Sequence, residues 1–495
     1  MDKRTLLWYM TFWGFAMNYM LRLNINIAIV SMIKHPAKNS NVTVVSECLR
    51  DIKLTEFNDT RGNTFPLELD AEDDKFDWDE TKQSTVLSSF FSLHMIMQIP
   101  GGILAQRYGA KNVVGISNGL AAILSFAIPL SAKIDYKVLA AIRLIQGFTS
   151  GAVWPAMHTM TAKWIPVHER SRFVSAYLGS SIGAAVTYIM CGYVIAMFGW
   201  ESVFHLTGVL GLLWYICWTI LIYESPAEHP TIGHKERVYI ENSIGKTVKM
   251  QSKLLPIPWK SMLTSRPLLI NALTQNGGVW GLLTLATQSP TYFNFVLGLN
   301  IKKTGLWSGM PYIARWLFAF GFGMFSDFLI KSKKLTITNV RKLATILCNI
   351  CQGLFILGIC FCGCNSTAAI IMVTLATAVN GSVSSGPLAG VVDLAPNYAG
   401  VIQGIVGTIT VFCTFFSPIL VGMFTLHQQT LGQWNKVFFL TSGICCSTGL
   451  LYVFCGDSEI QNWNYKYDVS VSKDKEMKLI KTKSDNKTNK NINNV

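Results

Sequence analysis

The amino-acid sequence predicts an all-α membrane protein, with twelve transmembrane helices in two six-helix bundles related by a pseudo-two-fold axis. The composition is apolar, with 50% hydrophobic and 14% charged residues, and the mean hydropathy is +0.35. A soluble protein would carry about a quarter charged residues. The apolar residues form runs of about 20, the length that a helix needs to cross a bilayer. Finally, the two halves of the chain repeat short motifs in corresponding places.

Twelve apolar runs are predicted to be spans, six on each side of a polar segment. In chain order they cover residues 6–33, 84–106, 112–132, 137–160, 172–197, 203–223, 267–297, 304–329, 343–363, 368–390, 399–425 and 436–456. The domains that follow are a first bundle over 1–223, a linker over 224–266, a second bundle over 267–457 and a tail over 458–495. We expect the lysine-rich tail to be disordered.

Charge orients these spans. Lysine and arginine cluster in alternate loops, so the positive-inside rule places both termini in the cytoplasm. The loop at 36–80 is acidic and carries sequons at Asn41 and Asn58, which we predict to be outside and glycosylated. The net charge of +14 is then explained by topology and by contact with anionic lipids. No nucleic-acid partner is predicted.

The twelve cysteines are not predicted to form a disulfide framework, because Cys48 is alone in the outer loop and most others lie in spans. Cys360, Cys362 and Cys364 lie close together in sequence but lack nearby histidine or acidic partners. No metal site is predicted there.

Two motifs recur in the two halves. Trp-x-x-Val-Phe opens the sixth span at 200–204 and the twelfth at 434–438. A loop rich in glycine and basic residues ends the second span, and a related loop ends the eighth. This repeat is typical of transporters that rock two bundles around a central site. We predict that the loops act as gating latches, through Gly102, Arg107, Gly109 and Asp327.

Arginines inside the apolar runs are the main functional signal. Arg22 and Arg143 lie within the first and fourth spans, where a desolvated guanidinium costs between ~3 and ~15 kcal/mol. If both face one cavity they would bind a carboxylate or phosphate. The structural alternative is that each bonds helix carbonyls or snorkels. Arg315 is a third such cation, which either contacts a more highly charged anion or stacks on an aromatic ring.

Several collinear motifs over residues 8–463 resemble one family, the anion–cation symporters of the major facilitator superfamily, which includes sialin, vesicular glutamate transporters and sodium–phosphate cotransporters. The matching segments are WD at 78–79, SFF at 89–91, QIPGG at 98–102, PAMH at 155–158, WIP at 164–166, ERS at 169–171, LAPNYAG at 394–400 and SEIQNW at 458–463. The resemblance implies the major facilitator fold. Gln106 departs from it, because the family pattern has an aspartate there.

The resemblance also assigns roles to residues. It implies that Arg22 and Arg143 are the family's arginines of spans one and four. Gln146 and Ser150 stand where proton-driven members carry glutamates. These neutral residues make the chain more similar to the sodium–phosphate branch of the family. His94 replaces a cavity-facing tyrosine, so it is a candidate substrate ligand or coupling group; the alternative is a bonded polar residue of the bundle. Separately, the segment around Ser385 is predicted to break the tenth span and expose backbone beside the cavity.

We therefore expect a secondary active transporter of small anions, either inorganic phosphate or organic anions. We expect it to act as a monomer without a cofactor, in the plasma membrane or an endolysosomal membrane, and to be driven by sodium or the membrane potential. Alternatives are a proton-coupled sialin-like symporter that uses His94, a chloride-conducting protein and a sensor. An enzyme is not expected, because no metal cluster, nucleophile elbow or phosphate loop is found.

Overall fold

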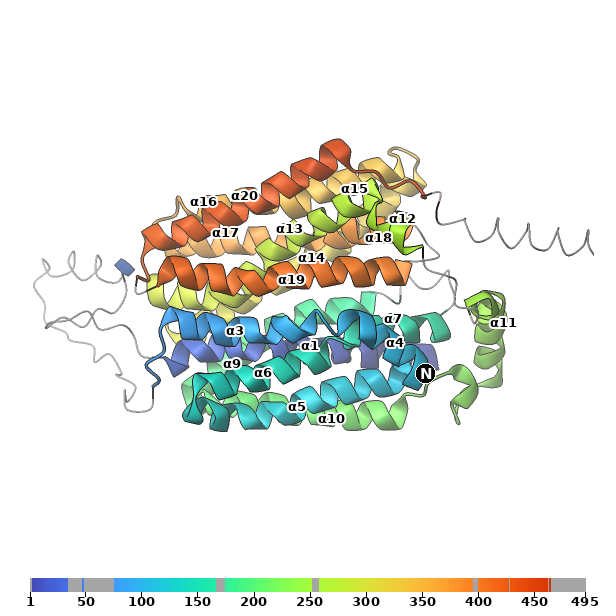
Figure 1. Cartoon of the computed structure of the whole chain (residues 1–495), viewed down its shortest axis with the longest axis horizontal. Coiled ribbons are helices and arrows are strands. Elements are labelled where there is room, and N and C mark those ends of the chain that lie inside the picture. The colour runs from blue at the N-terminus through green and yellow to red at the C-terminus, as the bar shows by residue number, and fades with distance from the viewer. Residues whose placement is uncertain are drawn as a thin grey trace, which may run out of the picture.

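The structure is a computed structural model that describes residues 2–33, 47–48, 75–165, 173, 175–251, 258–394, 399–426, 428–461 and 463. Its helices form two stacked bundles. Figure 1 shows those of the first half of the chain below and those of the second half above. We call the end of the molecule where α1 (Lys3–Met32) begins the inner end, and the end where it finishes the outer end.

The described ranges contain six helical rods in each half. The first half has α1, α3 (Glu80–His94) with α4 (Gln98–Tyr108), α5 (Ala110–Ile134), α6 (Tyr136–Ser150) with α7 (Val153–Trp164), η3 (Ser175–Leu178) with α9 (Gly179–Phe198), and α10 (Glu201–Leu221). The second half has α13 (Arg266–Thr291) with η5 (Tyr292–Val296), α14 (Ile301–Lys331), α15 (Ile337–Thr345) with η6 (Ile346–Cys351) and α16 (Gln352–Ile359), α17 (Ser366–Val379) with η7 (Asn380–Ser384) and α18 (Pro387–Leu394), α19 (Ala399–Thr425), and α20 (Leu431–Cys455).

These rods correspond to the twelve predicted spans. By length and composition alone, eight of the helices in the described ranges could each cross a membrane, and α3 with α4 makes a ninth that is bent by 43°. Polar residues such as Asn24 and Asn26 in α1, and Asn271 and Gln275 in α13, lower the mean hydropathy of these two helices.

Prolines account for the breaks within three of the rods. Pro100, Pro155 and Pro387 each lack the N–H that would bond to the carbonyl four residues earlier. Those carbonyls lie in the breaks between α3 and α4, between α6 and α7, and between α17 and α18. The predicted break near Ser385 is therefore present, as the short 3₁₀ helix η7 followed by a turn.

The two halves are closed against each other at the outer end. Backbones of α9 and α14 meet at Gly192 and Gly305, where a Cβ atom added to Gly305 would lie 2.8 Å from the Gly192 Cα and 2.5 Å from the Tyr188 carbonyl oxygen. The Tyr188 hydroxyl donates a hydrogen bond to the carbonyl of Ala286 on α13. One buried apolar cluster contains residues of both halves. Small residues thus let the halves approach closely, and polar contacts between the halves, such as the one from the Gln429 amide to the Glu80 carboxylate, add to the closure.

A disulfide corrects the cysteine prediction. Cys48 is not alone: it is bonded to Cys364, which lies between α16 and α17 in the second half. Its neighbour Glu47 accepts a hydrogen bond of 2.6 Å from the backbone N–H of Leu431, at the start of α20. The sequence separation of 316 residues explains why spacing could not reveal this pair. The outer loop of the first half is therefore tied covalently to the second.

The linker is anchored to the first half. Its helices are η4 (Pro226–Glu228), α11 (His234–Gln251) and α12 (Trp259–Leu263). The Glu236 carboxylate on α11 accepts hydrogen bonds from the backbone N–H groups of Lys3 and Arg4, both at 3.1 Å. Because these donors open α1, the carboxylate also complements the positive end of that helix. In Figure 1, α11 stands beyond the inner end of the bundles.

We expect Gly305→Val to prop open the outer end. Its side chain would enter a backbone contact, and such overpacking costs about 1–3 kcal/mol. A cysteine placed at Ala286 should then react faster with an outer, membrane-impermeant maleimide. The matched control is Gly321→Val on the same helix, because no atom lies within 4 Å of a Cβ there. Equal labelling in both variants would contradict this account of the closure.

The disulfide predicts that the two halves remain joined after the linker is cut. A protease site inserted between α11 and α12 should release two fragments on a reducing gel and one joined species without reductant. In Cys48→Ser the fragments should separate with and without reductant. Cys217→Ser, which removes an exposed thiol, should behave like the wild type and separate only with reductant. Separation of the unreduced wild-type fragments would rule out the disulfide.

Candidate functional site

Arg22 lies within α1, and in the described part of the chain no carboxylate pairs with its charge. Its side chain is only 6% exposed, and its Nε atom has no hydrogen-bond partner. The guanidinium carbon lies 4.6 Å from the ring centroid of Phe91 and 5.4 Å from that of Tyr19. These cation–π contacts lower the cost of burial but leave the N–H groups available. Arg22 is therefore placed to bind an anion.

Arg143 has protein partners instead. Its Nη1 atom donates to the Leu21 carbonyl at 3.1 Å and to Oε1 of Gln146 at 3.0 Å, and its Nη2 atom donates to the Arg22 carbonyl at 2.9 Å. The side chain is 1% exposed. These bonds fix α6 to α1 beside Arg22. They are the contacts that the structural alternative for Arg143 describes.

Arg315 joins the two halves. Its Nη1 atom donates to the Ser181 hydroxyl on α9 at 2.5 Å, and its Nε atom donates to Oδ1 of Asn380 in η7 at 3.0 Å. Neither partner is aromatic, and within the described chain no ring lies in cation–π contact with this guanidinium. Both acceptors are neutral, so the positive charge of Arg315 is solvated by dipoles but is not compensated.

Three tyrosines connect Arg22 with Arg315. Tyr19 and Tyr312 lie close enough to both guanidinium groups to interact with their charges. Tyr312 stacks on Tyr188, with ring centroids 5.9 Å apart. Tyr19 is three residues before Arg22, and Tyr312 is three residues before Arg315, so each pair shares a helix face. We call these five residues the arginine–tyrosine cluster.

No carboxylate accompanies this cluster in the described part of the chain. There, every aspartate and glutamate belongs to a loop, the linker or the end of a helix. The positions that would carry glutamates in proton-driven relatives are buried and neutral. Gln146 bonds to Arg143 and to the Ala121 carbonyl, and Ser150 is 1% exposed.

His94 lies inside the first half. It is 2% exposed, its Nε2 atom is 3.1 Å from Nε2 of Gln98, and its ring stacks on Phe90. Its buried Nδ1 atom has no hydrogen-bond partner among the described residues, and Arg22 is near enough to act on the ring electrostatically. The structure thus places His94 beside the cluster, at the last residue of α3, where this helix packs on α6.

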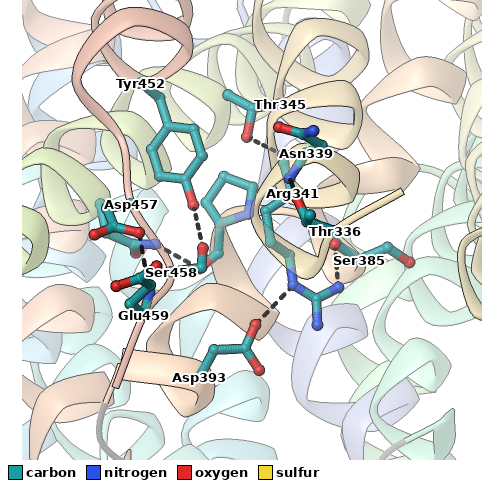
Figure 2. Close-up of polar contacts among 12 residues, drawn as sticks. Thr336, Asn339, Arg341, Thr345, Ser385, Asp393, Tyr452, Asp457, Ser458 and Glu459 are labelled. Atoms are coloured by element: carbon teal, nitrogen blue, oxygen red, sulfur yellow. Dashed lines mark hydrogen bonds and ion pairs between the residues drawn. The ribbon is translucent and has the colours of Figure 1, made fainter. Parts of the chain in front are cut away.

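Ser385 lies further towards the inner end than the cluster, five residues after Asn380. Its carbonyl accepts a hydrogen bond of 2.7 Å from Nη1 of Arg341, and Nε of Arg341 pairs with Asp393 at 2.8 Å (Figure 2). The backbone exposed by the helix break is therefore bound by a basic residue. A direct contact between Ser385 and the arginine–tyrosine cluster is not present.

The inner end of the first half has a matching network around Glu224. Its carboxylate accepts from the backbone N–H groups of Ala110 and Lys111 and pairs with Lys163 at 2.5 Å. Gly109 has φ +94°, and an added Cβ would lie 2.9 Å from the Glu224 carboxylate. The glycine requirement is thus explained by both backbone conformation and space.

The other predicted latch residues have looser surroundings. Gly102 packs near Pro155, Arg107 is exposed beside the ring of Tyr108, and Asp327 is exposed. In the described chain neither Arg107 nor Asp327 forms an ion pair. The residues that do form networks, Glu224, Arg341 and Asp393, were not predicted as sites. Their signal was the position of each charge at the inner end of a span.

Some predictions fall outside the described residues. They are the glycosylation sites Asn41 and Asn58, most of the loop at 36–80, the side chain of Gln106 and the tail after 463. Within the described residues, no group of three or more histidine, cysteine, aspartate or glutamate side chains could hold a metal ion.

Comparisons with known proteins agree on one family. The model of the Major Facilitator Superfamily matches residues 11–418. A Drosophila melanogaster protein named "Putative inorganic phosphate cotransporter" is 32% identical over 93% of this chain and 86% of its own length. Sialin of Ovis aries is 30% identical over 92% and 89%, and vesicular glutamate transporter 3 of Danio rerio is 30% identical over 94% and 74%.

Solved structures show the same fold at low sequence identity. A D-xylose–proton symporter aligns with a TM-score of 0.58 and 12% identity, over 92% of this chain and all of its own. A bacterial homologue of the human lysosomal transporter Spinster aligns with a TM-score of 0.60 and 11% identity, over 91% and 96%. The predicted fold class is confirmed.

The different surroundings of the two arginines predict opposite effects on stability. Arg143→Met removes three charge-assisted hydrogen bonds and should destabilise the protein by about 2–4 kcal/mol. Arg22→Met removes a buried charge that donates no hydrogen bond to the described part of the chain, so the melting temperature should be unchanged or raised. Thermal melts in detergent would measure both. A large loss of thermal stability in Arg22→Met with none in Arg143→Met would contradict this account, because it would make Arg22 the structural arginine.

Proposed function

Since the chain belongs to the major facilitator superfamily, and within it to the anion–cation symporter family, we propose that it carries small anions across a membrane by alternating access. It is a multi-pass membrane transporter and not an enzyme, as the sequence predicted. The proposed substrates are inorganic phosphate or small organic anions. One chain supplies both halves of the site, so the proposed unit of transport is a monomer.

The observation that carries this proposal is the unpaired guanidinium of Arg22. A buried cation without an acidic partner is costly in a membrane protein and usually serves a ligand. Its terminal nitrogens offer a planar pair of donors that suits carboxylate or phosphate oxygens. Arg143 would act as a positioning residue in this scheme, because its bonds to the carbonyls of Leu21 and Arg22 hold α1 in place.

The closed outer end supports the alternating-access part of the proposal. Arg22 belongs to the first half and Arg315 to the second, while the glycine contact between α9 and α14 seals the outer side. Rocking of the halves would break that seal and close the inner side instead. The networks around Glu224 and Arg341 each lie within one half, so each would keep its own bundle rigid during this motion.

We propose sodium or the membrane potential as the driving force. Gln146 and Ser150 cannot titrate, and the described membrane interior offers no carboxylate to carry a proton. Proton coupling through His94 is the second candidate, favoured by its unpartnered Nδ1 atom near Arg22. In that case His94→Gln would abolish the pH dependence of uptake.

The proposed membranes are the plasma membrane or an endolysosomal membrane, with both termini in the cytoplasm. The Cys48–Cys364 bond supports this orientation, because disulfides persist in the extracellular space and in oxidising lumens but are rare in the cytosol.

The proposal can be tested by uptake of labelled phosphate and a small organic-anion panel into proteoliposomes. Sodium, proton and voltage gradients would be imposed separately. We expect uptake driven by sodium or voltage, and a loss of at least about tenfold in Arg22→Gln, the value of one charge-assisted hydrogen bond. Lys302→Gln, which removes an exposed cation of α14, is the matched control. Current without coupled uptake would instead indicate a chloride-conducting pathway.

A further inference from the structure

We infer that the site selects anions with two negative charges, and that such an anion joins Arg22 in the first half to Arg315 in the second. The inference rests on the proposed function and names the substrate class of the same site. It assigns Arg315 a specificity role, separate from the binding role of Arg22. The argument has three parts: the local charge, the position of the two arginines and the neutral acceptor that Arg315 now uses.

The local charge favours a dianion. Arg22, Arg143 and Arg315 are all at least partly buried, and none is paired with a carboxylate in the described chain. Like-charged groups in a poorly hydrated interior repel each other strongly. A singly charged anion on Arg22 would leave the charge of Arg315 uncompensated. An anion with two charges offers one to each arginine, so it relieves more of this electrostatic cost.

The position of the two cations allows one ligand to reach both. Tyr19 and Tyr312 each interact with both arginines, and Tyr312 stacks on Tyr188. The residues of the cluster therefore come from α1, α9 and α14, and the two tyrosines lie near both cations. The hydroxyls of Tyr19 and Tyr312 can donate to anion oxygens without adding charge, whereas that of Tyr188 already donates to the Ala286 carbonyl. A tetrahedral oxyanion or a short dicarboxylate has acceptors on opposite sides, as this arrangement requires.

Ser181 indicates what the anion would replace. Its hydroxyl accepts from Arg315 at 2.5 Å and so already links the second half to the first. A hydroxyl is a weaker acceptor for a guanidinium than an anionic oxygen. A dianion bound by Arg22 would therefore compete for Arg315 and draw α14 onto the ligand. A monoanion would bind Arg22 but would not hold the two halves together.

The test compares pairs of anions that differ mainly in charge. Succinate and succinamate have nearly the same shape, with two charges and one at neutral pH. Methylphosphonate, in alkaline buffer, and methanesulfonate are the tetrahedral pair. Wild-type proteoliposomes should take up the dianion of the transported shape at least about tenfold faster. Arg315→Gln should reduce that ratio to near one, and Arg315→Lys should restore part of it.

A second variant tests the same charge without removing Arg315. Ser181→Asp places a carboxylate against that guanidinium, so it should also lower the dianion-to-monoanion ratio. Lys303→Gln, an exposed cation on α14, should leave the ratio unchanged. Thermal melts would confirm that each variant is folded.

The outcomes separate the two proposals. If the wild-type protein carries no anion of either pair and no phosphate, the proposed function fails. If it carries dianion and monoanion equally well, the function stands and the dianion inference is overturned. The inference also fails if the wild type prefers the dianion but Arg315→Gln and Ser181→Asp both keep the wild-type ratio of dianion to monoanion uptake.

Discussion

Desolvation of three guanidinium groups is the constraint on which this structure depends. Each arginine meets it differently. Arg143 is bonded to helix carbonyls, Arg315 to a hydroxyl and an amide, and Arg22 only to aromatic faces. The cost of the remaining charge can be met by an anionic ligand. Arg143 therefore forms the most hydrogen bonds to the protein, and Arg22, which forms the fewest, is the position best suited to a ligand.

Much of the fold was predictable, because its signals are local. Apolar runs predicted the positions of the twelve helical rods, and the segment around Ser385 predicted the break before Pro387, whereas the breaks near Pro100 and Pro155 were not predicted. The disulfide was not predictable, since no local pattern connects Cys48 with Cys364. The close contact of α9 with α14 was also missed. Glycines at 192 and 305 are unremarkable in sequence and acquire meaning only when two distant helices are brought together.

The site shows the same limit at smaller scale. Sequence identified Arg22, Arg143 and Arg315 as buried cations, because charge inside an apolar run is visible in one dimension. Which way each guanidinium turns depends on the neighbouring helices, so the sequence offered bonds to helix carbonyls as one alternative for Arg143 but could not choose it or name α1 as the partner. The ionic networks at the inner end also involve other residues than the predicted ones. The predicted Asp327 is exposed, whereas Glu224 and Asp393 form the ion pairs.

The Cys48–Cys364 bond has a consequence for how the protein is made. Its partners are 316 residues apart, so at roughly 5–20 residues per second the first thiol waits about 15–60 s for the second to be synthesised. During that interval Cys48 is available to oxidoreductases and to other thiols. The bond can close only after the ninth span has been made. Its formation therefore reports that the second bundle has begun to assemble beside the first.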